Sequence, residues 1–174
     1  AMIRTLEDMQ RMVEQTLRFA RGDAVEENTE DLDLRVLLDG LVDDARRRLL
    51  GESVGPGRSR ETSSIRLDAP ETAPYRGRPL ALQRALQNLL DNALRFGRQV
   101  SLQLRQQASA SGQSGWLVTV DDDGPGIPAE LMDKVFEPFF QVDAARSQGA
   151  GGVGLGLSIA RSAVQGHGGV LSLH

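Results

Sequence analysis

The chain has 174 residues, of which 40% are hydrophobic and 25% charged, as expected for a globular domain with one sizeable core. Its net charge of −4 argues against nucleic-acid binding, which usually needs a basic surface. Cysteine is absent, which excludes disulfides and thiolate metal sites, and no apolar run approaches the roughly 20 residues that span a bilayer. We therefore expect neither a nucleic-acid partner nor direct membrane contact from this segment.

The first predicted element is an amphipathic helix over residues 2–20. Its apolar side recurs at alternating steps of four and three, the heptad spacing of helical bundles, at Met2, Leu6, Met9, Val13, Thr16 and Ala20. Gly22 is a typical helix stop. The pattern fits either half of a dimeric bundle or a helix that packs on its own domain, and we favour the bundle.

Residues 23–31 are acidic and polar and predict a linker. A second helix is predicted after it, with Asp33 as the candidate N-cap. Its apolar face consists of Leu32, Leu34, Leu37, Leu38, Leu41, Val42, Ala45 and Leu49.

A loop rich in Gly, Ser and Arg is predicted over residues 51–64, followed by a short strand over residues 65–67. The next helix begins at Pro79, a residue that suits the first helical turn, and is ended by Gly97. A wide stripe of leucine and alanine lines one side of this helix, so it should pack against the core.

Alternating apolar residues predict a half-buried strand over residues 100–104, and a second strand over residues 116–120. A Ser/Gly hairpin loop over residues 108–115 joins them. Residues 128–135 predict a short helix, and residues 136–151 lack any period and should form a mobile cover.

A helix over residues 154–164 and a final strand over residues 170–173 complete the pattern. Strands outnumber the crossover helices, which predicts an α+β fold: a mixed sheet with helices on one face, in a two-layer α/β sandwich.

Three polar segments in this pattern carry chemistry. In the first, Asn88 and Asn92 lie one helical turn apart, so both amides leave the same side of the helix, and Arg95 can lean toward the same space. Amide oxygens are hard ligands that suit Mg²⁺. The alternative is a pair of surface asparagines, but the leucines and alanines around them leave these amides at the border of an apolar surface.

The second segment places Asp121, Asp122 and Asp123 after a strand, where three carboxylates repel one another unless a donor is near. An adenine amino group is such a donor, and Gly124 and Gly126 would let the backbone approach the ring. The alternatives are an exposed acidic turn or a calcium loop. The calcium loop is excluded because the alternating ligand spacing and the distal glutamate are absent.

The third segment, residues 152–157, leads glycines into a helix whose free N–H groups and positive dipole end can receive phosphates. A flexible hinge is the alternative. Residues 149–154 also match the dinucleotide fingerprint GxGxxG, but no strand runs directly into them and no acidic residue follows at the required distance.

These segments resemble the ATP-binding catalytic domain of bacterial sensor histidine kinases, in the superfamily shared by DNA gyrase, a heat-shock chaperone and the mismatch-repair protein MutL. Four family motifs are matched in order: the asparagine box, the first glycine box, the phenylalanine box and the second glycine box, at residues 88–93, 122–127, 136–140 and 152–157. Kinases of the osmosensor type are the most similar. The resemblance implies the Bergerat-type ATP-binding fold.

The resemblance also implies roles for individual residues. Asp122 would accept a hydrogen bond from the adenine amino group, Asn92 would bind Mg²⁺, and Asn88 and Arg95 would lie beside the phosphates. The residues implied to bind ATP are Asp122, Gly124, Gly126, Ile127, Phe136, Phe140, Arg146, Gly152, Gly154, Leu155 and Gly156. Catalysis of this kind consists of positioning and charge neutralisation.

The chain departs from the family at its start, because no histidine followed by an acidic residue and a nearby Thr-Pro is present. His167 lies in a helix-to-strand turn and is expected to be structural. We therefore expect residues 1–22 to be the end of a dimerisation hairpin, residues 23–33 a linker with an edge strand, and residues 34–174 the catalytic domain. The fragment is expected to be truncated before the acceptor histidine and unable to phosphorylate itself.

The resemblance places the chain in the cytoplasmic part of a bacterial inner-membrane sensor. The expected partners are its own histidine hairpin, in a homodimer, and the receiver domain of a response regulator. Two rivals remain on the same fold: an ATP-gated interaction module or an anti-sigma-type serine kinase, and a degenerate sensor without nucleotide. The heptad helix argues against the first rival, and the intact Asn92, Asp122 and Gly156 against the second.

Overall fold

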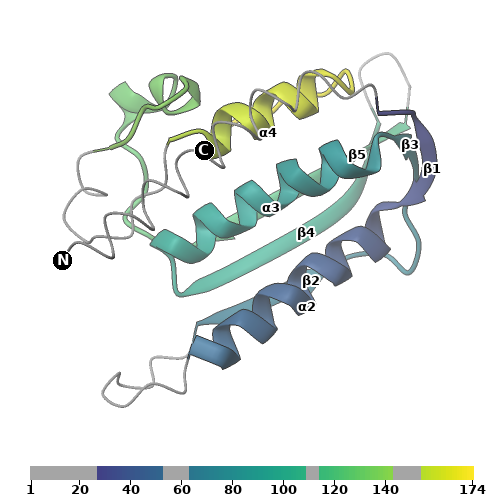
Figure 1. The fold of residues 1–174 in the computed structure, drawn as a ribbon, viewed down its shortest axis with the longest axis horizontal. Helices are drawn as coiled ribbons and strands as arrows, with labels where there is room; N and C mark the ends of the chain where they lie inside the picture. Colours follow the sequence, from purple (N-terminus) through teal and green to yellow (C-terminus); the bar gives the residue numbers. More distant parts are fainter. Residues whose placement is uncertain (1–26, 53–62, 109–113, 143–153) are drawn as a thin grey trace. The chain divides into compact units, whose positions relative to one another are not determined.

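The computed structural model describes residues 27–52, 63–108, 114–142 and 154–174 (Figure 1). They divide into two compact units. The sheet unit comprises residues 29–79 and 89–126, and the α4 unit comprises the described residues of 1–28, 80–88 and 127–174. The helix predicted over residues 2–20 lies outside the described residues.

The sheet unit contains a mixed sheet of three strands in the order β2-β4-β5. β2 (Ser64–Asp68) pairs in parallel with β4 (Gln99–Ala108), which pairs antiparallel with β5 (Ser114–Asp122). The predicted mixed sheet is thereby confirmed. A separate antiparallel pair joins β1 (Glu30–Asp33) to β3 (Pro74–Gly77).

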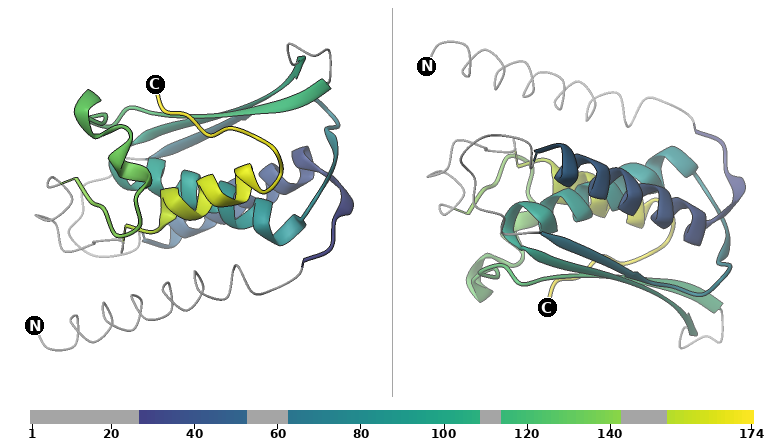
Figure 2. Two further views of the ribbon diagram at one scale, coloured as in Figure 1. Left: turned by 90° about the horizontal axis from the view of Figure 1, so that it is seen from above. Right: turned by 90° about the horizontal axis from the view of Figure 1, so that it is seen from below.

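Helix α2 (Leu34–Glu52) lies along one face of the β2-β4-β5 sheet, as both views of Figure 2 show. The largest fully buried side chains of this unit come from α2, β4 and the second part of α3, and are Leu38, Val42, Leu90, Leu102 and Leu104. Alternate residues of β4 are buried because successive side chains of a strand point to opposite faces. The predicted half-buried strand is therefore confirmed.

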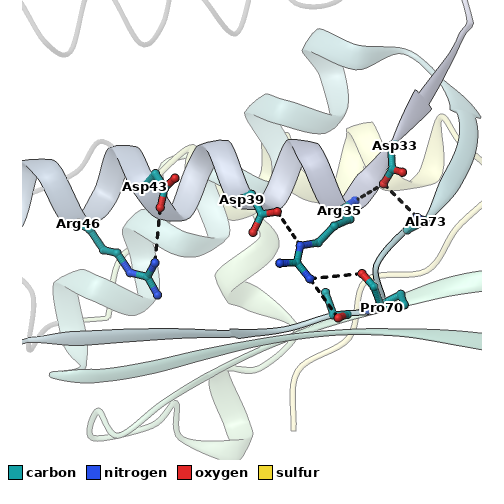
Figure 3. Close-up of polar contacts among 8 residues, drawn as sticks. Asp33, Arg35, Asp39, Asp43, Arg46, Pro70 and Ala73 are labelled. Carbon is teal, nitrogen blue, oxygen red and sulfur yellow. Dashed lines mark hydrogen bonds and ion pairs between the residues drawn. The ribbon is translucent and has the colours of Figure 1, made fainter.

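The start of α2 is fixed by Asp33, the N-cap expected from the sequence (Figure 3). Its Oδ1 accepts hydrogen bonds from the backbone N–H of Arg35 at 2.8 Å and of Ala73 at 3.0 Å. The guanidinium of Arg35 donates to Asp39 at 2.6 Å and to the carbonyl oxygen of Pro70 at 3.3 Å. These bonds connect the first turn of α2 to the segment between β2 and β3.

The placement of Leu32 in the second helix was wrong. Leu32 lies in β1, where it pairs with Tyr75 of β3. The helix begins at Leu34, directly after Asp33. The Asp33 side chain acts as the N-cap, because it accepts the backbone N–H of Arg35 in the first turn of the helix.

Helix α3 (Pro79–Phe96) contributes its first part to the α4 unit and its second part to the sheet unit. Its predicted bounds are confirmed: proline occupies the first turn, and the backbone N–H of Gly97 donates to the carbonyl of Ala93 at 2.7 Å. The helix carries both asparagines of interest.

The α4 unit also contains two short 3₁₀ helices, η1 (Ala129–Leu131) and η2 (Lys134–Phe136), and the helix α4 (Gly156–Gln165). The single helix predicted over residues 128–135 was therefore wrong. The run is too short to nucleate a stable α-helix alone, and i to i+3 bonds such as that from Leu131 N–H to the carbonyl of Pro128, at 2.8 Å, form instead.

The final strand predicted over residues 170–173 was also wrong, since these residues have no regular structure. Their alternation alone cannot make a strand, because a strand needs a pairing partner and none pairs with them in the described part of the chain. His167, which precedes them, donates from Nδ1 to the carbonyl of Ala163 at 2.7 Å and has the expected structural role.

Candidate functional site

Asn88 and Asn92 are both half-buried on α3 and lie one turn apart. In the α4 unit, Asn88 lies against the first residue of α4. A Cβ added to Gly156 would be 3.5 Å from Oδ1 of Asn88 and 3.8 Å from its Cγ. The asparagine box and the second glycine box are thus neighbours at this point.

The N-terminus of α4 has backbone donors to offer. Its N-cap residue, Leu155, forms no side-chain cap hydrogen bond, and no acidic residue lies in the first turn. The Leu155 side chain is itself buried, which fixes the chain just before the helix. The first N–H groups of a helix have no partner within the helix, and the dipole makes this end positive. An anionic group can be received here, next to the amide of Asn88.

Gly154 holds the phenylalanine box to the start of α4. It adopts φ +78°, a left-handed conformation, so α4 begins at Gly156 and not at residue 154 as expected. Its carbonyl accepts a hydrogen bond from the N–H of Phe139 at 2.9 Å. A Cβ at Gly154 would be 2.6 Å from the carbonyl oxygen of Phe140, so only glycine fits this contact.

The phenylalanine box is anchored at its other end by η2. The guanidinium carbon of Arg161, on α4, lies 4.9 Å from the centroid of the Phe136 ring, in a cation–π contact. Val135, the residue before Phe136, is buried, and Phe136 and Phe140 are half-buried. Phe139 is 57% exposed with φ 67°, a conformation that strains a residue with a bulky side chain.

In the sheet unit, Asp122 is the last residue of β5, so the strand extends two residues beyond the predicted end. Its Oδ1 accepts a hydrogen bond from the N–H of Gly124 at 2.8 Å. Asp122 pairs with Val100, whose buried side chain shares its face of the sheet, whereas Asp121 points to the opposite face. Asp122 thus lies on the same face of the sheet as Val100, and the residue is exposed at the end of the strand.

Of the three adjacent carboxylates, Asp123 is the one bound by backbone donors from the start of β4 and the residue before it. Its Oδ1 accepts hydrogen bonds from the backbone N–H of Arg98 at 2.6 Å and of Gln99 at 2.9 Å. The N–H groups of Gln99 and then Arg98 hold the pKa of the Asp123 carboxyl below its ordinary value. Asp123 therefore pins the end of β5 to the start of β4.

The end of α3 packs tightly against the first glycine box. A Cβ on Gly97 would be 2.7 Å from the Cβ of Asp122, and one on Gly124 would be 3.0 Å from the carbonyl oxygen of Phe96. Sequence reasoning took Gly97 only as a helix stop and missed this packing role. The signal was a pair of glycines, each next to a strand end, but the pattern alone does not show that these two strand ends meet.

Arg95 lies against its neighbour on α3. Its guanidinium carbon is 5.1 Å from the centroid of the Phe96 ring. Partial desolvation lowers the pKa of Arg95, which nevertheless remains a cation at neutral pH. The cation stays at the end of the helix where the helix dipole favours it.

The remaining predicted residues are placed as follows. Gly126 has φ +73° and open space where a Cβ would point, so it is required by conformation and not by packing. Ile127 is half-buried. Arg146 and Gly152 lie outside the described residues. The structure brings Asn88 to Gly156 and Asp122 to the end of α3, and the convergence of all these groups on one ligand stays a prediction.

The described residues meet the requirements of neither a metal cluster nor a membrane-spanning helix. They include no group of three or more His, Cys, Asp or Glu side chains placed to hold a metal ion. None of their helices combines the length and hydropathy needed to cross a membrane.

Comparison with known proteins identifies the family. Residues 77–174 match the family of histidine kinase-, DNA gyrase B- and HSP90-like ATPases. The chain is 34% identical to the sensor histidine kinase GtrS of Pseudomonas aeruginosa, across 98% of this chain and 31% of that protein. It is 42% identical to the sensor histidine kinase CpxA of Escherichia coli, across 56% of this chain and 21% of that protein. The chain thus spans less than a third of these relatives.

Solved structures agree with the sequence comparison. The mycobacterial sensor histidine kinase MprB superimposes with a TM-score of 0.63 at 27% identity, covering 81% of each chain. The ATP-binding domain of PrrB from Mycobacterium tuberculosis gives a TM-score of 0.61 at 25% identity, covering 85% of this chain and 88% of that one. Sequence motifs, fold and family match agree, and the chain belongs to the histidine kinase-, DNA gyrase B- and HSP90-like ATPase family, with sensor histidine kinases among its relatives.

Proposed function

We propose that this chain binds ATP with Mg²⁺ and acts as the catalytic domain of a sensor histidine kinase. The observation that carries the proposal is the contact between Asn88 and Gly156. It places a polar amide beside a helix N-terminus whose N-cap residue, Leu155, makes no side-chain cap hydrogen bond, and whose first residue is a glycine. Among the described residues, the α4 unit therefore has a suitable place for the phosphates.

The donor set fits magnesium. Mg²⁺ keeps several waters and is usually bound by one or two protein ligands together with substrate phosphates. Asn92 would supply the protein ligand, and Asn88 would order a water or a phosphate oxygen.

The adenine base would be held in the sheet unit. The Oδ1 atom of Asp122 is engaged by the N–H of Gly124, and we propose that its other oxygen accepts a hydrogen bond from the adenine amino group. Gly124 and Gly126, with Ile127, would line the base. A side chain at position 124 would collide with Asp122 and with the end of α3, so Gly124 lets the first glycine box pack closely on this helix.

Bound ATP would supply the phosphoryl group for transfer, and the protein would position it. In the longer protein we propose transfer to a histidine of a dimerisation hairpin, whose last part is residues 1–22, and then to an aspartate of a response regulator. The negative charge of the phosphates would be neutralised by Arg95 and Arg146. The cover would be held by Phe136 and Phe140, and the phosphate tail by residues 152–156. None of these 174 residues is a histidine followed by an acidic residue and a nearby Thr-Pro, so we propose that the acceptor belongs to another part of the longer protein.

We also propose the finer features of the class. The catalytic domain would have the two-layer α/β fold of the Bergerat type, and the parent would be an osmosensor-like kinase of the bacterial inner membrane with this segment in the cytoplasm. The relatives GtrS and CpxA, which are sensor histidine kinases, support this assignment.

Titration of a fluorescent ATP analogue, with Mg²⁺ and with EDTA, tests the proposal. The wild-type chain should bind the analogue more tightly with Mg²⁺, and Asn92→Ala should lose at least about tenfold in affinity only when Mg²⁺ is present. Gln83→Ala, which removes an exposed amide from the same helix, is the matched control. A wild-type chain that does not bind the analogue, or an equal loss for Asn92→Ala with and without Mg²⁺, would contradict the proposal.

A further inference from the structure

The N-terminus of α3 is capped by a side chain from far upstream in the sequence. The helix begins at Pro79, which has no N–H, and its N-cap residue Arg78 makes no side-chain cap hydrogen bond. The N–H groups of Leu80 and Ala81 both donate to the carboxylate of Glu27, Leu80 to Oε1 and Ala81 to Oε2, the latter at 2.9 Å. One carboxylate therefore satisfies two donors that the helix cannot satisfy itself.

This cap is a tertiary contact. Glu27 lies 53 positions before Leu80 in the sequence, just ahead of β1. A carboxylate is also the group that the positive end of the helix dipole favours. The segment that leads into the ATPase domain is therefore bound to the first turn of the helix that carries the asparagine box.

Glu27, residues 80–88 and Gly156 all belong to the α4 unit. Between the cap and Asn88 the helix is continuous, and Ala85 and Leu86 are buried. A helix is stiff over this length because each turn is hydrogen-bonded to the next. A shift of the first turn would consequently be passed along the helix to Asn88 and change its position relative to Gly156.

We propose that Glu27 is a positioning residue for nucleotide binding. It holds the first turn of α3 and thereby keeps the amide of Asn88 beside the N-terminus of α4. The inference rests on the proposed function, since it assumes that Asn88 faces the phosphates or their metal.

The chain provides a matched control for a purely structural role. Asp33 also uses one carboxylate to accept two backbone N–H groups, and it caps α2. None of the proposed nucleotide-binding residues lies on α2. Glu27→Ala and Asp33→Ala therefore each remove a carboxylate cap of the same kind, but only the first affects the helix of the asparagine box.

Three measurements on the wild-type chain and these variants separate the two roles: hydrogen exchange at the amides of Leu80 and Ala81, affinity for Mg-ATP, and affinity for adenosine. Glu27→Ala should speed exchange at both amides and weaken Mg-ATP by roughly three- to tenfold, in line with the loss of a helix cap. Adenosine affinity should stay constant, because adenosine has no phosphates. Glu27→Gln keeps one carbonyl acceptor and should recover part of the Mg-ATP affinity.

Asp33→Ala should lower the melting temperature and leave the affinity for Mg-ATP at the wild-type value. Wild-type Mg-ATP affinity in Glu27→Ala, or an equal loss in Asp33→Ala, overturns the positioning role and leaves the proposed function intact. If the wild-type chain binds neither adenosine nor Mg-ATP, the proposed function and this inference are both overturned.

Discussion

The side chain of Asn88 borders the position that a Cβ of Gly156 would occupy: a Cβ there would be 3.5 Å from the amide oxygen Oδ1 of Asn88. A separation of this size is an ordinary van der Waals distance, so the absence of a side chain here is not forced by packing. Gly156 is also the first residue of α4, where alanine would be favourable for the helix. A glycine that the fold does not need points to a ligand that needs the space.

Gly156→Ala should therefore separate stability from binding. The added methyl should be neutral or stabilise the chain by up to about 1 kcal/mol, because alanine is the better helix former. It should weaken Mg-ATP binding, because it occupies the space beside Asn88. Thermal unfolding and nucleotide titration of the same preparation check both halves, and unchanged Mg-ATP affinity would show that no ligand approaches Gly156.

Gly154→Ala should have the opposite character and destabilise the chain. Its φ of +78° costs an L-residue about 1–2 kcal/mol, and the new Cβ would be 2.6 Å from the carbonyl oxygen of Phe140. The melting temperature should fall clearly. Gly40→Ala is the control, because Gly40 lies in α2 with nothing within 4 Å of the added Cβ, and it should be neutral or stabilising. Similar melting temperatures for the two variants would refute the argument.

Asp122→Asn should weaken adenine nucleotides while it preserves the fold. The amide oxygen can still accept the hydrogen bond from Gly124, but an NH₂ group replaces the second oxygen and meets the adenine amino group donor to donor. The expected loss is about 1–3 kcal/mol in binding free energy. Asp121→Asn removes the same charge from the opposite face of β5 and should bind as the wild type does. Equal losses for both variants would indicate a charge effect, not recognition of the base.

Sequence patterns predicted the parts of the fold whose determinants are local. The bounds of α3 were predictable because Pro79, a broad apolar stripe and Gly97 are contiguous in the sequence. The cap of α2 was predictable for the same reason, since Asp33 bonds to a residue two positions away. The polar and glycine-rich motifs likewise drew attention to Asn88 and Asp122, whose roles in nucleotide binding stay predictions.

The parts that sequence patterns missed depend on contacts between distant positions. Leu32 was assigned to the apolar face of the second helix because its side chain fits the helical period, although an edge strand was also expected within residues 23–33. Pairing with Tyr75 places Leu32 in β1. The cap that Glu27 provides for α3 spans 53 positions, and no local pattern encodes it. Gly97 was taken as a helix stop because its contact with Asp122 appears only when two strand ends are brought together.

Asp123 should make the stability of the chain depend on pH in the acidic range. The N–H groups of Gln99 and Arg98 bind its carboxylate, so the pKa of Asp123 is lower in the folded chain than its ordinary value of 3.8. A depressed folded-state pKa adds stability above the unfolded-state value, and this contribution disappears as the pH falls through the folded-state value.

Asp123→Asn isolates this contribution, because the amide oxygen can still accept both N–H groups while the charge is lost. The wild type should melt higher than Asp123→Asn from pH 7 down to about pH 5, and the difference should then shrink as the pH is lowered further. Asp121→Asn controls for the general loss of one negative charge at this end of β5. Melting curves collected across the acidic range decide the matter, and a difference that stays constant down to pH 3 would mean that Asp123 does not hold β4 and β5 together through its charge.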